Sequence, residues 1–233
     1  MIKQITILIF IFLLFTRCDE GKIYPKETEN VTGGKVTLNA SFKDTEAWPQ
    51  EYMLVLAACE EDEDLPIVSK IIPEPKNQGE KVSVTLNGID ERSKKIVVAI
   101  VNKGRQILYN YYTYPISDVN AEITLPIEEI NLACYDRIQQ QVFNAYCTRC
   151  HGAGDHAAAN LYLTEGKSHK ALVNVKAPLS ETGKMLVKPN KAEESFLIDI
   201  LNQDIIQYNH TDVLPENELV TLIKTWINKG AEE

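Results

Sequence analysis

The chain has 233 residues, 44% of them hydrophobic, and a formal net charge of -9 at pH 7. This apolar content supports a packed core and argues against a disordered chain, and the length suits one large domain or two small ones. The acidic balance excludes the clustered basic surface that nucleic acid requires, so we expect no nucleic-acid partner.

The first residues predict an export signal. Lys3 supplies a positive charge, residues 5–15 form an apolar run in which Thr6 is the one polar residue, and Cys18 follows just before a polar stretch. The run is shorter than the roughly 20 residues that span a bilayer, which is typical of a secretion signal. Cys18 resembles the lipidated Cys of a bacterial lipoprotein signal, although Arg17 stands where that signal usually has a small residue.

On this resemblance, residues 1–18 are a lipoprotein signal peptide and residues 19–32 are a tether between the anchor and the fold. The protein would then belong to the cell envelope, attached to the membrane by its lipid outside the cytoplasm, on the periplasmic face or the outer-membrane surface. The alternative is an ordinary secretory signal with a chance Cys. In both cases the mature chain meets an oxidising compartment.

Residues 33–126 predict an all-β domain. Short runs with alternating apolar residues are separated by clusters of Pro, Gly, Asn and Asp, which is the pattern of strands joined by turns. Seven such runs are expected, at residues 36–42, 52–58, 67–72, 82–86, 96–101, 107–113 and 123–125. Their number and spacing predict a β-sandwich of immunoglobulin or fibronectin type.

Two features of this region suggest binding but have a simpler explanation. An aromatic stripe for carbohydrate could be built from Tyr109, Tyr111, Tyr112 and Tyr114, but alternation along a strand places these rings in pairs on opposite faces. The acidic run at residues 60–64 lacks the spaced ligands and the turn glycine of a calcium loop, so we expect a solvated loop.

The periodicity becomes helical after Pro126. Ile138, Val142 and Tyr146 are four residues apart, which predicts a helix over 135–146 that leads directly into Cys147. Shorter helices are expected around residues 168–173 and 193–202. A terminal helix, with Gly230 just beyond its end, is predicted by the spacing of Leu219, Leu222, Ile223, Trp226 and Ile227.

Residues 147–151 have the sequence CxxCH. Cys147 and Cys150 can both reach the vinyl groups of one porphyrin from a single helical turn, and His151 then lies under the iron as its proximal ligand. A structural zinc site would need a second ligand pair, and the chain has no other CxxC. A thiol redox motif normally opens a helix after a strand, whereas this one closes a helix. A simple disulfide or a chance match is the remaining alternative.

With this motif, residues 134–233 resemble a small single-haem cytochrome c domain. The resemblance rests on CxxCHG at 147–152 and, in order and spacing, on residues 161–163, 187–190, 195–197 and 226–231. It implies that residues 127–233 form an all-α cytochrome c domain with one haem c. In that family the first and last helices cross beside the haem, which would place Phe143, Tyr146 and Trp226 at their contact. The expected fold is therefore multi-domain, with an immunoglobulin- or fibronectin-like sandwich followed by this all-α domain.

The haem motif favours electron transfer, and no catalytic triad spacing, phosphate loop or pair of carboxylates lies beside it, so we expect no enzymatic activity. The protein would exchange electrons with a redox partner protein that the sequence does not identify. The sixth iron ligand departs from the family pattern, because Leu214 stands before Pro215 where the family usually has Met. His210 on the same loop is our first candidate for the distal ligand and Met185 a less favoured one, with an open or weakly ligated iron as the third possibility. His210 could equally be a polar loop residue, and Met185 could fill the core.

Two further functions stay open. The missing distal Met is compatible with a haem-based sensor or gas-binding module, and a structural lipoprotein could instead use its sandwich to bind a partner protein or a glycan. The pairing of Cys59 with Cys134 is also open. An oxidising compartment would allow a disulfide between them, whereas a Cys in an apolar run, such as Cys59, can simply act as a small hydrophobe.

Overall fold

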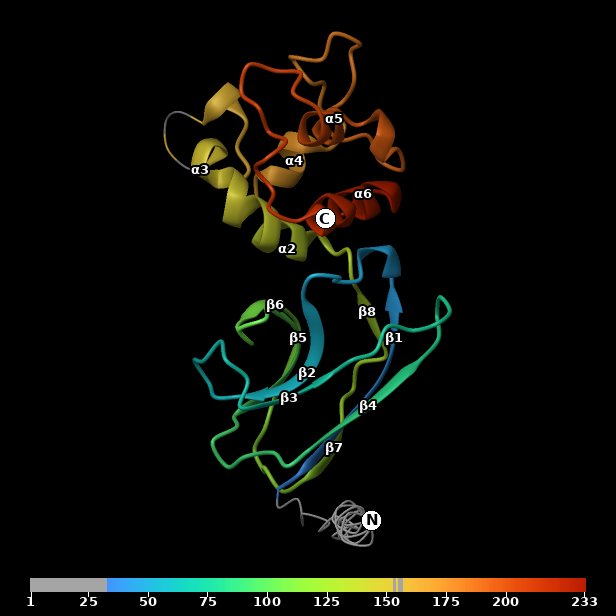
Figure 1. Ribbon diagram of the computed structural model, residues 1–233, viewed down its shortest axis with the longest axis vertical. Helices are drawn as coiled ribbons and strands as arrows, with labels where there is room; N and C mark the ends of the chain where they lie inside the picture. Colours follow the sequence, from blue (N-terminus) through green and yellow to red (C-terminus); the bar gives the residue numbers. More distant parts are fainter. Residues whose placement is uncertain (1–32, 153, 155–156) are drawn as a thin grey trace, which may run out of the picture. The chain divides into compact units, whose positions relative to one another are not determined.

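The computed structural model describes residues 33–152, 154 and 157–233 (Figure 1). The expected signal peptide 1–18, its lipidated Cys18 and the tether 19–32 lie outside these residues. Within the described part of the chain, no helix is long and apolar enough to cross a membrane.

The first sheet is built around β1 (Lys35–Lys43), in which buried positions alternate with more exposed ones. The first half of β1 pairs antiparallel with β4 (Val82–Asn87) and parallel with β7 (Glu122–Thr124), and its second half pairs parallel with β8 (Glu129–Asn131). Alternation sends every second side chain to the same face. The buried face of β1 consists of Val36, Leu38, Ala40 and Phe42.

The second sheet is antiparallel throughout, in the order β3-β2-β5-β6. Its strands are β2 (Met53–Cys59), β3 (Val68–Ile71), β5 (Lys95–Val101) and β6 (Ile107–Pro115). Leu56 of β2 packs into the main core with β1, while Val55 of β2 and Val97 of β5 belong to a second apolar cluster on the opposite face. Because both faces of β2 and β5 are buried, their sequences are almost continuously hydrophobic.

The two sheets form a β-sandwich-like arrangement (Figure 1). Each of the seven runs expected between residues 33 and 126 is a strand. The parallel pairings of β1 depart from the expected antiparallel sandwich, and β8 extends the first sheet past residue 126. Residues 33–126 are therefore not all of the sheet region, and the division of the chain into domains at residue 126 stays a prediction.

Residues 135–151 form a continuous series of helical turns. They comprise α2 (Tyr135–Ile138), the π-helical segment η3 (Gln139–Cys147) and α3 (Thr148–His151). The predicted helix over 135–146 is confirmed, and Ile138, Val142 and Phe143 are buried as expected. The wider π-helical turns were not predicted, because hydrophobic spacing alone does not separate them from α-helical turns. Such turns are uncommon and frequently lie at functional sites.

The remaining helices are α4 (Ser168–Leu172), α5 (Phe196–Asn202) and α6 (Asn217–Asn228), near the three predicted positions. Beyond α6, the Gly230 amide donates to the Ile227 carbonyl at 3.1 Å and the Ala231 amide donates to the Trp226 carbonyl at 3.0 Å. This is a Schellman ending, and it needs the positive φ of 112° that Gly230 adopts. Single-turn segments occur at η2 (Thr45–Ala47), η4 (Ala158–Asn160) and η5 (Ala192–Glu194).

The expectation of an all-α cytochrome c domain over residues 127–233 is wrong. The protein is rich in sheet and its helices are short, and much of the chain after His151 consists of turns and loops. Isolated β-bridges join Val173 to Val187 and Met185 to both Lys176 and Ser195. Asn174 adopts a positive φ just beyond the end of α4, and Gly183 and Asn190 do so in the loop between α4 and η5. The short periodic stretches in the sequence did not reveal these turns.

The contact between the first and last helices uses a different residue from the one expected. The ring of Tyr135 lies with its centre 6.2 Å from that of Phe143 and 5.2 Å from that of Trp226. Tyr135 therefore takes the place that the resemblance gave to Tyr146.

Candidate functional site

The CxxCH motif occupies the last helical turn before a loop. Cys147 ends η3 and is half-buried, whereas Cys150 in α3 is exposed, and neither forms a disulfide. His151 closes α3. One turn thus carries both thiols and the imidazole, as the spacing predicted, with one thiol at the protein interior and one toward solvent.

The His151 side chain is held by the loop that follows it. Its Nδ1 lies 3.0 Å from the carbonyl oxygen of Ala158, and because a carbonyl only accepts, Nδ1 carries the proton of this hydrogen bond. The backbone of the same residue is also fixed, since the Leu163 amide donates to the His151 carbonyl at 2.8 Å. The pKa of His151 is lowered mainly by burial, with a smaller lowering by His210, while the carbonyls of Ala158 and Leu161 oppose the shift. A neutral ring with its proton on Nδ1 leaves Nε2 as a lone-pair donor.

Gly152 is required by the path of the chain directly after His151. A Cβ atom at this position would lie 2.1 Å from the carbonyl oxygen of Thr148, which is backbone of the same motif and cannot move aside. Any side chain here would push the end of α3 out of place. The Gly that follows the CxxCH motif therefore has a local steric reason in this fold.

His210 lies beside this motif although it is distant in sequence. The ring centres of His151 and His210 are 6.3 Å apart, and the ring planes differ by 28°. Met185, the less favoured distal candidate, lies in the β-bridges with Lys176 and Ser195 and is about a third exposed. Leu214 packs against the hydrophobic core. The structure thus brings together His151 and His210 among the residues that the sequence offered as iron ligands.

The other histidine of the described region has a structural role. His169 Nε2 donates to the carbonyl of Ala231 at 2.8 Å, and its ring packs against the rings of Tyr135 and Trp226 with centres 5.1 and 6.1 Å away. His169 therefore helps to fix the C-terminus. His156 lies outside the described residues.

The thiols do not have the properties of a redox-active CxxC pair. Burial raises the pKa of the Cys147 thiol to about 12, and Cys150 adds a smaller effect in the same direction. Reactive thiols of that class have a lowered pKa that maintains a thiolate near neutral pH. A structural zinc site has no support either, because no group of three or more His, Cys, Asp or Glu residues converges within the described chain.

Cys59 and Cys134 are unpaired in the structure. Cys59 is buried in β2, where burial raises the pKa of its thiol to about 11. Cys134 precedes α2, and its Sγ lies 3.3 Å from the Tyr109 hydroxyl. Cys59 thus behaves as the small hydrophobe that was one of the two expectations.

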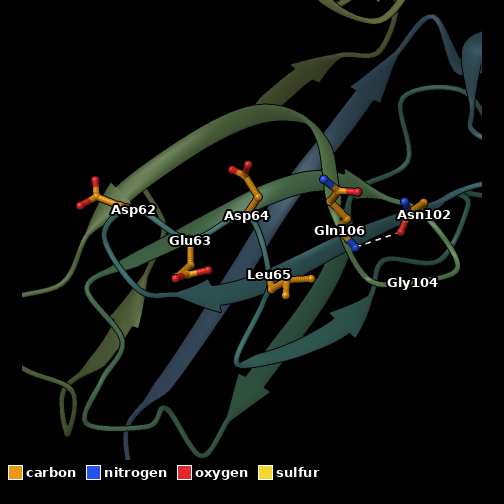
Figure 2. Close-up of a pocket in the computed structure, with 7 residues that line it drawn as sticks. All are labelled: Asp62, Glu63, Asp64, Leu65, Asn102, Gly104 and Gln106. Carbon is orange, nitrogen blue, oxygen red and sulfur yellow. Dashed lines mark hydrogen bonds between the residues drawn. The ribbon is translucent and has the colours of Figure 1, made fainter.

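The acidic run lies in the loop after β2 and borders an open depression of about 440 Å³ (Figure 2). Figure 2 shows the side chains of Asp62, Glu63 and Asp64 directed apart from one another and not toward a common point. At the same depression, Asn102 Oδ1 accepts a hydrogen bond from the backbone N–H of Gln106 at 2.9 Å. This arrangement agrees with the solvated loop expected from the sequence.

The tyrosines of β6 fix the motif helix to the sheet region and do not form a binding stripe. The hydroxyl of Tyr109 donates to Asp136 at 2.9 Å, and that of Tyr111 donates to the Leu132 carbonyl at 3.0 Å. Their rings contact each other edge to face, with centres 4.8 Å apart. The polar atoms of these rings are therefore used within the fold.

Sequence reasoning missed Arg137, which is only 1% exposed. Its guanidinium donates at 2.7 to 2.9 Å to Gln141, to the Tyr111 hydroxyl and to the carbonyls of Ala47 and Leu132. In the described part of the chain it forms no ion pair, and its charge is met by these oxygen acceptors and by the Tyr111 ring, whose centre lies 5.9 Å from Cζ. An arginine two positions into a predicted helix gives no signal of this kind, because arginines are usually exposed.

Comparisons with protein-family models, with curated proteins and with solved structures give no match to this chain. The case for its function therefore rests on its own residues.

The residues of the motif fit a covalently attached haem. Two thiols separated by one helical turn, an adjacent imidazole held through Nδ1, and a Gly where no side chain has room together form the donor set that such a group requires. The sheet-rich fold does not alter this local arrangement, because all of these groups lie on residues 147–152 and the loop that holds them.

Proposed function

We propose that this protein carries one haem c, attached covalently through Cys147 and Cys150 with His151 as the proximal iron ligand, and that it transfers electrons at the cell envelope. The observation that carries the proposal is the His151 side chain, whose Nδ1 is held at 3.0 Å by the Ala158 carbonyl. Metal-bound histidines commonly have their second ring nitrogen fixed in this way, which sets both the tautomer and the ring orientation.

Each residue of the motif has a defined task in this proposal. The two thiols would hold the haem covalently, and His151 would bind its iron. Gly152 lets the chain turn away next to the Thr148 carbonyl without displacing His151. The bound haem would supply one-electron chemistry, and the surrounding residues would tune it through axial ligation and burial.

The proposed location follows from the start of the chain. Cys18 would carry the lipid that attaches the protein to the membrane outside the cytoplasm, and residues 19–32 would link the anchor to the fold. The proposed partners are the membrane, through this anchor, and a redox protein. We propose no enzymatic role.

The test is covalent haem content in full-length protein produced with a cytochrome c maturation system. A pyridine haemochrome spectrum after denaturation and acid-acetone extraction should show one retained haem c per chain, and Cys147→Ala combined with Cys150→Ala should abolish it. Cys134→Ser is the matched control, because it alters a partly exposed Cys outside the motif and should retain the haem.

The same preparation tests electron transfer. The wild-type protein should be reduced and reoxidised reversibly in voltammetry at an electrode with small-molecule mediators. Wild-type protein without covalent haem would contradict the whole proposal. A covalent haem that does not cycle between its two oxidation states would contradict the electron-transfer role alone.

A further inference from the structure

The loop between α5 and α6 positions an imidazole next to the CxxCH motif. We infer that His210 is the distal axial ligand of the haem iron, so that the iron is held between two histidines and is closed to exogenous gases. This inference rests on the proposed haem attachment and adds the identity of the sixth ligand to it.

The spacing of the two rings is the first argument. An imidazole nitrogen binds a first-row metal ion at about 2.0–2.1 Å, as in zinc sites, and lies about 1.1 Å from its ring centre, so two imidazoles on opposite sides of one ion have ring centres roughly 6.3 Å apart. The centres of His151 and His210 are 6.3 Å apart. Direct packing of two rings needs no particular value within the wide 4.5–7 Å range of aromatic contacts.

The hydrogen bonds of the two rings are the second argument. His210 Nδ1 lies 2.8 Å from the carbonyl oxygen of Tyr208, in the same way that His151 Nδ1 lies 3.0 Å from that of Ala158. A carbonyl accepts and cannot donate, so each ring carries its proton on Nδ1 and retains a lone pair on Nε2. Both rings therefore have the tautomer that leaves Nε2 free to bind a metal ion.

The loop around His210 is ordered by its own contacts. The Tyr208 ring meets the His210 ring edge to face, with centres 5.1 Å apart. Asn209 Oδ1 accepts hydrogen bonds from both the amide and the hydroxyl of Thr211 at 2.8 Å, and the Val213 amide donates to the His210 carbonyl at 3.2 Å. These contacts hold the loop in the conformation that places the His210 ring next to that of His151.

Leu214 stands at the position where the family usually has the Met ligand. Its side chain packs against the hydrophobic core and holds this loop to the rest of the fold. A nitrogen ligand in place of sulfur lowers the haem potential relative to a His and Met pair, because a thioether raises it. Two strong-field ligands also keep the iron low-spin and leave no position for carbon monoxide.

The experiment uses full-length haem-loaded protein and compares its visible and electron paramagnetic resonance spectra with those of variants. Wild-type protein should be fully low-spin when ferric, and when ferrous it should bind carbon monoxide only as slowly as His210 dissociates from the iron. His210→Ala should become high-spin and bind carbon monoxide at least tenfold faster, and added imidazole should restore the low-spin spectrum. The restoration shows that the variant is folded and lacks only a ligand.

Two further variants sharpen the result. His210→Met should remain six-coordinate with a raised midpoint potential, and the matched control His169→Gln should leave the iron spectrum unchanged, because His169 contacts the C-terminus. A high-spin wild type, an unchanged spectrum of His210→Ala, or loss of the low-spin signal in Met185→Leu would overturn the inference while leaving haem attachment intact. Absence of covalent haem in the wild type would overturn both proposals at once.

Discussion

The sheet region and the helical region of this protein bury different kinds of side chain. The interior of the two sheets is apolar, and Ser93, in the turn before β5, is the one buried polar side chain among the described residues before residue 135. The region from residue 135 onward buries a larger set of polar groups, which are Arg137, Gln139, Gln141, Ser168, Ser195 and Thr225. Burial of apolar area depends little on direction, whereas a buried polar group must meet its partner at a set distance and angle.

This difference suits the role that we propose for the helical region. A sheet core is stabilised by the area it removes from water. A ligand site needs side chains held in one geometry, and hydrogen-bonded interior groups provide that. Gln139 shows the principle, since its amide donates to the Leu163 carbonyl at 2.9 Å and to Asn144 at 2.7 Å, next to the loop that holds His151.

The largest expected effect comes from Arg137, where the two regions meet. Arg137→Met removes the donors to the Ala47 carbonyl and to the Gln141 side-chain oxygen and leaves these buried acceptors without that partner, whereas the Leu132 carbonyl keeps its hydrogen bond from the Tyr111 hydroxyl. We expect the free energy of unfolding to fall by about 2–4 kcal/mol, because each unsatisfied buried group costs about 1–3 kcal/mol and the lost desolvation penalty of the charge offsets part of this.

Urea unfolding of the full chain measures this loss, with Arg92→Met as the matched control. Arg92 is exposed and pairs with Asp90 on the surface, so its replacement should stay within about 0.5 kcal/mol. Equal effects of the two variants would show that polar burial does not distinguish the regions.

The regular strands and helices could be predicted from the sequence, and the irregular segments could not. The strands could be predicted because a half-buried strand alternates along its length, as β1 does, and the motif helix and α6 could be predicted from apolar residues four and three apart. The short bridged segments around Met185 could not, since turn residues and single β-bridges leave no periodic signal.

The candidate site was predictable to a similar extent. CxxCH identifies Cys147, Cys150 and His151 by local spacing, and loop position alone made His210 a candidate. The pairing of the His151 and His210 rings depends on the path of the chain between α5 and α6, which no local pattern specifies. The burial of Arg137 could not be predicted for the same reason, because its hydrogen-bond partners come from three separate segments.

An effect of intermediate size is expected when a buried polar side chain of the helical region is compared with an apolar one of the sheet core. Gln139→Leu keeps a similar volume but removes the amide that donates to the Leu163 carbonyl and the oxygen that accepts from the Ser168 hydroxyl. We expect a loss of about 1–3 kcal/mol in the free energy of unfolding. Leu38→Met in the sheet core, also similar in volume, should cost less than about 1.5 kcal/mol. Thermal unfolding of both variants, compared with wild type at the same pH, gives the difference, and a reversed order would contradict the comparison.

The smallest effect is expected at the exposed edge where the two regions meet. Lys229, at the end of α6, lies 3.6 Å from Asp44 and 3.3 Å from Glu46, both at η2. The Lys229 pKa is raised, first by its hydrogen bond to Glu46, and the Glu46 pKa is lowered, first by a backbone hydrogen bond and then by Lys229. The three groups are solvated to different degrees, and an exposed pair is typically worth about 1 kcal/mol or less.

Lys229→Met should therefore reduce the free energy of unfolding by less than about 1 kcal/mol at pH 7 and low salt, and the sign of its pH dependence is fixed by these shifts. A raised Lys pKa stabilises the fold at every pH below the unfolded value near 10.4 and is lost above it, while a lowered Glu pKa stabilises above the unfolded value near 4.3 and is lost in acid. The difference between wild type and variant should hence be constant from about pH 5 to 9 and shrink on both sides. It should also disappear in about 1 M salt, where the screening length falls to about 3 Å. A difference that survives high salt would mean that the aliphatic stem of Lys229 stabilises this edge by packing and that its charge contributes little.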